Sequence, residues 1–213
     1  MLSYEQALEH LLAAAEPVAE IKLLPLAVAR GRILAEPLVS TVTVPPLDNS
    51  AMDGYAVRCA DITQAGAELP VSQRIPAGSV GHTLSPGTAA RIFTGAPVPA
   101  GADAVVMQEF CEHGNAGGVI VNQVPKAGQN IRRAGEDIAA GAEVLPAGKR
   151  LGPAEIGLAA SIGFAQVPVR RHLRVALLST GDELTEPGNP LPPGGIYNSN
   201  RHFLRAMFEA LGC

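Results

Sequence analysis

Residues 45–57 read PPLDNSAMDGYAV and combine a proline pair, turn-forming residues and the start of a strand. The Pro45-Pro46 pair favours an extended approach, because proline fixes its own φ and restricts the residue before it. Asp48-Asn49-Ser50 and Asp53-Gly54 are turn formers, and the residues from Gly54 to Arg58 are typical of a strand start. The stretch therefore places two carboxylates in a turn-rich segment before a strand, where binding groups often lie. A surface turn that satisfies only its own backbone is the alternative.

Before this stretch the sequence predicts helical structure. Ser3 and Gln6 have the spacing of a capping box, and the apolar stripe after them predicts a packing helix of about four turns. Residues 24–30 predict a short second helix. Residues 32–44 then have an extended, proline-punctuated pattern.

After it, helical patterns vanish between residues 45 and 150. Short β-like runs alternate there with Gly, Pro, Asn and Asp turns, which predicts a β-rich domain. The clearest runs are residues 104–107, 118–124 and 144–145. A helix is expected again from Pro153 to Ile162.

The last forty residues change character. Residues 173–178 form a continuous apolar run typical of a buried parallel strand, and an amphipathic helix is expected from Ser199. Ligands of open α/β sheets bind at the carboxyl ends of strands, which is where Asp182 and Glu183 are expected. One strand and one helix cannot cover a sheet on both faces, so we expect only the start of an α/β domain here.

Composition excludes several classes of protein. The chain is 47% hydrophobic and 17% charged, enough apolar material for a sizeable core. No apolar run approaches the roughly 18 residues of a membrane span, and the acidic N-terminal helix is unlike a signal peptide, so we expect a cytoplasmic protein without membrane contact. Three cysteines without a CxxC pair favour neither disulfides nor zinc. A net charge of −4 without a basic run argues against nucleic acid as a partner.

Five segments in order resemble the molybdopterin molybdenumtransferase (MoeA/gephyrin) family, N-terminal part: residues 45–57, 91–99 (RIFTGAPVP), 101–109 (GADAVVMQE), 128–138 (GQNIRRAGEDI) and 174–184 (RVALLSTGDEL). The resemblance implies an α+β multidomain fold. In it, a helical, elongated domain (1–40 and 146–168) is interrupted by an inserted β-rich domain (41–145), and an incomplete α/β molybdopterin-binding domain (172–213) follows. It also implies insertion of molybdate into adenylylated molybdopterin with release of AMP, by a homodimer.

The same resemblance implies catalytic roles for Asp53, Thr94, Asp137 and Glu183. We assign Asp48, Asn49, Ser50 and Asp182 to cofactor binding. Two points stay open: the Thr94 hydroxyl could donate to an oxyanion or bond its own backbone, and Arg132 or Arg133 could hold a phosphate or pair with Glu136 and Asp137.

Charge constrains these roles. Molybdate and a pyrophosphate-bearing pterin are anions, and bare carboxylates would repel them. Mg²⁺, which binds one or two carboxylates together with substrate phosphates, is therefore the expected cofactor, although no single carboxylate stands out as its ligand.

A second hypothesis comes from the early end of the expected α/β domain. The chain could be a truncated, non-catalytic binding or dimerisation fragment of such a protein. Turnover to AMP separates this hypothesis from the enzyme.

Overall fold

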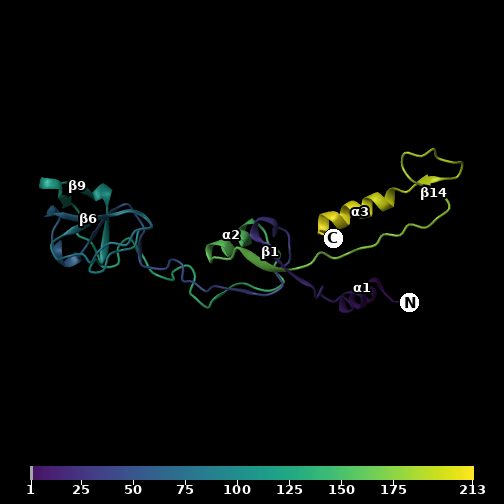
Figure 1. Ribbon diagram of the computed structural model, residues 1–213, viewed down its shortest axis with the longest axis horizontal. Helices are drawn as coiled ribbons and strands as arrows, with labels where there is room; N and C mark the ends of the chain where they lie inside the picture. The colour runs from purple at the N-terminus through teal and green to yellow at the C-terminus, as the bar shows by residue number, and fades with distance from the viewer. Residues whose placement is uncertain (1) are drawn as a thin grey trace. The chain divides into compact units, whose positions relative to one another are not determined.

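The computed structural model describes residues 2–213, which fold as two compact units (Figure 1). One unit contains residues 2–38 and 145–213, and the other contains residues 39–144. The second unit is thus an insertion between two parts of the first. The sequence places this insertion at 41–145; those boundaries, and a separate domain at 172–213, stay predictions.

A four-stranded sheet organises the unit of residues 39–144. Its strand order is β6-β7-β4-β8: β6 (Val71–Ile75), β7 (Ala89–Ile92), β4 (Gly54–Val57) and β8 (Ala104–Met107). β4 pairs antiparallel with both β7 and β8, and β6 pairs parallel with β7. The strand that follows the 45–57 loop therefore lies inside the sheet, with a neighbour on each side.

Both faces of this sheet are buried. Neighbouring residues of a strand point to opposite faces, and each face packs against its own apolar cluster. In β4, Ala56 packs in a cluster with Ile75 and Ile92. The next residue, Val57, packs in a second cluster with Val106 and Val119. This explains why the β4 and β8 sequences are apolar without alternation.

A three-stranded sheet, β5-β10-β9, completes the second cluster, and short pairs link the loops. The bounds are β5 (Ala67–Leu69), β10 (Val119–Val121), β9 (Cys111–His113), β3 (Asn49–Ser50) paired with β11 (Ile131–Arg132), and β2 (Leu38–Val39) paired with β12 (Glu143–Leu145). Single 3₁₀ turns lie at η2 (Cys59–Asp61), η3 (Gln108–Phe110) and η4 (Asn115–Gly117). The predicted strands at 104–107, 118–124 and 144–145 all overlap observed strands.

The other unit is built on an antiparallel pair, β1 (Ile21–Pro25) and β13 (Gln166–Arg170), with α2 (Pro153–Ser161) beside it (Figure 1). Residues 32–35 lie between β13 and residues 149–151: Arg170 N–H donates to Ile33 O at 2.8 Å, and Leu151 N–H donates to Arg32 O at 2.9 Å. α2 begins at Pro153 as predicted, and Gly152 N–H donates to Glu155 Oε2 at 2.9 Å.

The helix predicted at 24–30 is wrong. β1 occupies residues 21–25, and only the single 3₁₀ turn η1 (Leu26–Val28) follows it. Pairing with β13, more than 140 residues away in the chain, overrides the local helical preference.

The N-terminal helix α1 (Tyr4–Ala13) has the predicted capping box, since Gln6 N–H donates to Ser3 Oγ and Ser3 N–H to Gln6 Oε1. Its ten residues are shorter than the expected four turns. The prediction that it packs is also wrong: none of its residues is buried, and Leu11 is 71% exposed. No described element covers its apolar stripe.

The strand predicted at residues 173–178 does not form. A strand needs a neighbour to satisfy its backbone N–H and C=O groups, and none pairs with this run within residues 2–213. Leu178 is 92% exposed. Beyond it lie a short parallel pair, β14 (Leu184–Thr185) with β15 (Ile196–Tyr197), and α3 (Ser199–Leu211), which begins where predicted. No helix in the described chain is long and apolar enough to span a membrane.

Candidate functional site

β3 joins three of the segments that the sequence singles out. Ser50 pairs with Ile131 and Asn49 with Arg132. On its other side, Ser50 N–H donates to Ala96 O at 2.9 Å, and Gly95 N–H donates to Ser50 O at 2.8 Å. The 45–57, 91–99 and 128–138 segments therefore meet in one place, and they bring six of the eight predicted site residues into the same unit.

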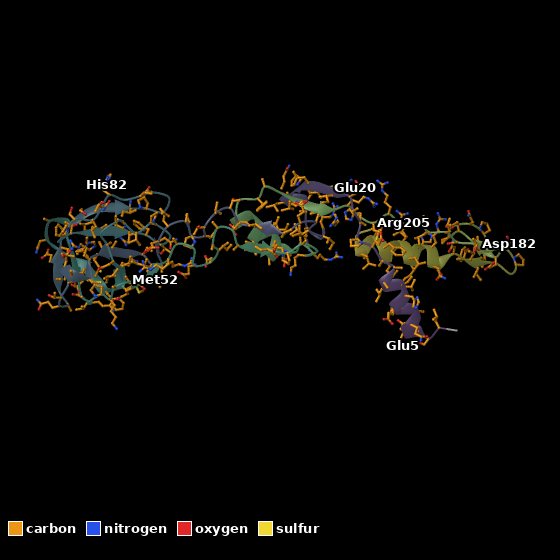
Figure 2. The ribbon with its side chains drawn as sticks, turned by 90° about the horizontal axis from the view of Figure 1, so that it is seen from below. Glu5, Glu20, Met52, His82, Asp182 and Arg205 are labelled. Carbon is orange, nitrogen blue, oxygen red and sulfur yellow. The ribbon has the colours of Figure 1, made fainter. Side chains whose placement is uncertain are left out.

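Asp53 and Thr94 contact each other directly. Asp53 ends the loop that contains Met52 (Figure 2) and precedes β4, while Thr94 follows β7. Asp53 Oδ1 accepts from the Thr94 N–H at 2.8 Å and from the Thr94 hydroxyl at 2.7 Å. These bonds, with the nearby Arg91 charge, lower the pKa of the Asp53 carboxyl. The Thr94 hydroxyl thus bonds a side chain across the sheet rather than its own backbone.

Asp48 ties the 45–53 loop to the 128–138 loop. Its carboxylate accepts from the Ala134 N–H at 2.8 Å and from Arg133 Nη1 at 2.5 Å. The Ala134 bond contributes most to lowering the pKa of Asp48, and Arg133 adds to it. Asp48 O also accepts from Val98 N–H at 2.9 Å, so this residue connects its own loop to two others.

Arg132 is paired within its own loop. Its guanidinium lies 2.6 Å from Asp137 Oδ1 and 3.4 Å from Glu136 Oε1. Both arginines of the charged run therefore make ion pairs with carboxylates of the unit, which is the solvated-turn alternative. All of these groups are at the surface, where an arriving phosphate could compete for them.

Asn49 and Ser50 differ from the acidic residues. Ser50 is buried, and its hydroxyl donates to Met52 O at 2.6 Å, so it is used inside the loop. Asn49 Oδ1 is buried without a hydrogen-bond partner among the described residues. These side chains shape the loop from within.

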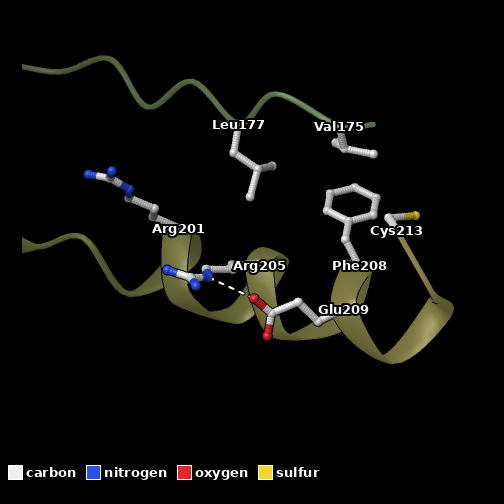
Figure 3. Close-up of a pocket in the computed structure, with 7 residues that line it drawn as sticks. All are labelled: Val175, Leu177, Arg201, Arg205, Phe208, Glu209 and Cys213. Carbon is white, nitrogen blue, oxygen red and sulfur yellow. Dashed lines mark hydrogen bonds and ion pairs between the residues drawn. The ribbon is translucent and has the colours of Figure 1, made fainter. Parts of the chain in front are cut away.

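Asp182 and Glu183 lie in the other unit and are exposed. They precede β14, and Glu183 O accepts from Ile196 N–H at 2.8 Å. The expected position at the end of a buried strand is wrong, because residues 173–178 form no strand. The pocket between residues 175–177 and α3 (Figure 3) contains no predicted site residue; there Arg205 pairs with Glu209 at 2.9 Å.

Sequence reasoning missed Arg91. The Arg91 guanidinium lies 5.3 Å from the Tyr55 ring centroid and 4.5 Å from that of Phe93. It donates to Gly54 O at 2.8 Å and to Gln108 Oε1 at 2.6 Å, and so braces the strand beside Asp53. Only the strand register, in which Tyr55 faces Arg91, reveals this role.

The donor set limits how a metal ion could bind. Within residues 2–213 no three His, Cys, Asp or Glu side chains are grouped as metal ligands. Asp48 and Asp137 are engaged by arginines, whereas both Thr94 bonds fall on Asp53 Oδ1 and leave Oδ2 without a partner among the described residues. One oxygen fits the Mg²⁺ mode that uses a single carboxylate with substrate oxygens and water.

A family model described as "MoeA N-terminal region (domain I and II)" matches residues 2–163 of this chain. The chain belongs to the MoeA family. The molybdopterin molybdenumtransferase of Haemophilus influenzae is 43% identical over 214 residues, which cover 100% of this chain and 53% of that protein. Molybdopterin molybdenumtransferase 2 of Mycobacterium tuberculosis is 44% identical over 193 residues, covering 88% of this chain and 47% of that protein.

A solved MoeA structure has the same fold. The crystal structure of the molybdopterin biosynthesis moeA protein from Pyrococcus horikoshii OT3 matches with a TM-score of 0.91 and 35% identity, over 98% of this chain and 57% of that one. The resemblance seen in the sequence is confirmed. This MoeA chain spans about half the length of the curated relatives it matches.

Proposed function

We propose that this chain is the N-terminal part of a molybdopterin molybdenumtransferase, which inserts molybdate into adenylylated molybdopterin and releases AMP in molybdenum cofactor biosynthesis. The observation that carries the proposal is the joining of three family-like segments at β3, with Asp53 and Thr94 in contact at 2.7 Å. The names of the relatives support the substrate class.

In this proposal Asp53 supplies a negatively charged carboxylate, and Thr94 orients that carboxylate. The two bonds from Thr94 fix the carboxylate, and its lowered pKa keeps it ionised at neutral pH. Mg²⁺ held at Asp53 Oδ2 would supply positive charge to phosphate and molybdate oxygens. Arg132 and Arg133 would exchange their present carboxylate partners for substrate phosphate, which a guanidinium group can bind through two N–H groups.

The Glu183 and Asp182 roles and the homodimer are part of the same proposal. Both residues are exposed and form no ion pair within the described chain, so their carboxylates are available to a ligand. If the protein is a homodimer, analytical ultracentrifugation of the protein expressed over its whole reading frame should give twice the mass of one chain.

The Asp53→Asn variant separates a catalytic charge from a structural role. Asparagine keeps an oxygen that can accept both Thr94 bonds, but it carries no charge. In cells lacking their own molybdenumtransferase, the protein expressed over its whole reading frame should restore molybdoenzyme activity. Asp53→Asn should abolish the rescue while circular dichroism shows that the variant is still folded. Glu143→Gln removes one charge from an exposed side chain without hydrogen bonds and is the matched control. Full rescue by Asp53→Asn would contradict the proposal.

The alternative function is a binding or dimerisation module without catalysis. It is favoured by the pairing of Arg132 and Arg133 with carboxylates. Calorimetric titration of the 213-residue chain with adenylylated molybdopterin decides: binding without AMP supports the module, and AMP release supports the enzyme.

A further inference from the structure

Four arginines from three separate parts of the chain lie together at one end of the β1–β13 pair. Arg32, Arg150, Arg170 and Arg171 line a single pocket of about 340 Å³, together with Pro17, Val18 and residues 172–173 and 211–213. The strand pairings bring them there. Ile33 is bridged to Arg150 on one side, and Arg170 N–H donates to Ile33 O on the other.

The pairing puts like charges on one face. Leu34 faces Val169, so the antiparallel register places Ile33 opposite Arg170 as well as opposite Arg150. Residues directly opposite one another point to the same side of a sheet. Arg150 and Arg170 therefore flank Ile33 in one row, and their positive charges lie on the same side of these three segments.

Protein groups provide little compensation. Within residues 2–213, no carboxylate lies within 4.0 Å of the guanidinium nitrogens of Arg32, Arg150 or Arg170. Glu20 is the nearby acid, and it is shared between Arg171 at 2.8 Å and Lys22 at 3.8 Å.

The arginines are held by backbone carbonyls instead. Arg32 Nη2 donates to Arg170 O at 2.6 Å, Arg150 Nη1 to Gly31 O at 3.2 Å, and Arg170 Nη1 to Ala19 O at 3.2 Å. Each of these contacts uses one guanidinium nitrogen and leaves other N–H donors for a ligand. Neutral acceptors position the guanidinium groups without cancelling their charge.

We propose that this cluster is a binding site for a phosphate group with two or more negative charges, either free or as the ester of a small molecule. The planar N–H fork of arginine matches phosphate oxygens bidentately, and several arginines with one shared carboxylate suit a multiply charged anion. The apolar Pro17 and Val18 give the pocket a wall for the organic part of an ester. The site belongs to the unit of residues 2–38 and 145–213, and it stands independently of the proposed transferase activity.

The test uses the purified 213-residue chain at low ionic strength, with inorganic pyrophosphate, ADP and adenosine as probes in calorimetry. Pyrophosphate and ADP should bind and adenosine should not. A double Arg150→Gln and Arg170→Gln variant should bind roughly ten- to hundredfold more weakly, as expected for lost charged hydrogen bonds. Tighter binding of ADP than of pyrophosphate identifies an ester, and equal binding identifies the phosphate alone.

The matched control is a double Arg201→Gln and Arg205→Gln variant, which removes the same charge from α3, where both arginines already pair with glutamates. It should bind pyrophosphate like the unaltered chain. Circular dichroism checks that both variants are folded. Equal weakening in the two double variants, or no binding of pyrophosphate beyond that of chloride at matched ionic strength, would overturn the proposal.

Discussion

Replacing Gly54 by alanine should destabilise the unit of residues 39–144 severely. Gly54 lies in β4 opposite Met107 of β8, and a Cβ added there would sit 2.0 Å from Val106 O and 2.9 Å from Val106 C. The obstacle is backbone, so no side-chain rotation relieves it. Overpacking costs typically about 1–3 kcal/mol, and because β4 and β8 must separate we expect about 3 kcal/mol or more.

For a unit of this size, that loss corresponds to a fall in the unfolding midpoint of roughly 10–20 °C. Circular dichroism gives the unfolding midpoint, and hydrogen exchange by mass spectrometry shows which unit is destabilised. Peptides from β4 and β8 should exchange faster, while those from α2 and β13 keep their protection. Gly157→Ala is the control, because a Cβ there meets no atom within 4 Å and the residue is inside α2. It should stabilise by roughly 0.5–1 kcal/mol. An unchanged midpoint for Gly54→Ala would refute the close-approach argument.

Two further predictions concern titratable groups. The folded state lowers the pKa of Asp48 below its ordinary 3.8. The stability that the ionised carboxylate contributes is therefore present above pH 3.8 and is lost as the pH falls through the lower, folded-state pKa. In urea titrations at a series of pH values, Asp48→Asn should reduce this loss of stability in acid. Burial raises the pKa of Cys59 and Cys111 to about 11, whereas Cys213 is exposed. At pH 8 a disulfide reagent should label Cys213 rapidly, and fast labelling that persists in Cys213→Ser would contradict this assignment.

Local signals predicted those elements whose ends carry specific caps or whose residues form a continuous apolar run. The Ser3 capping box, Pro153 at the start of α2 and the apolar run of β8 are all where the sequence places them. Asp48, Asp53 and Thr94 were singled out from turn chemistry and family resemblance; the structure brings them into one unit, and their functional roles stay predictions.

Long-range pairing explains what the sequence could not predict. The residues near Leu24 pair with β13, and residues 173–178 find no partner strand, so the local pattern misleads in both places. Gly54 begins β4 as expected, but the sequence could not show that the close approach of β8 requires a glycine there. Arg91 acts through rings and carbonyls that only the register brings together.

AMP release in vitro tests the proposed transferase activity and the role of Asp53 together. The protein, produced over its whole reading frame, is mixed with adenylylated molybdopterin, molybdate and Mg²⁺, and AMP is measured by chromatography beside the Asp53→Asn and Glu143→Gln variants. The unaltered protein and Glu143→Gln should release AMP only when molybdate is present, and Asp53→Asn should release none. AMP release that is independent of molybdate, or equal in all three proteins, would contradict this proposal.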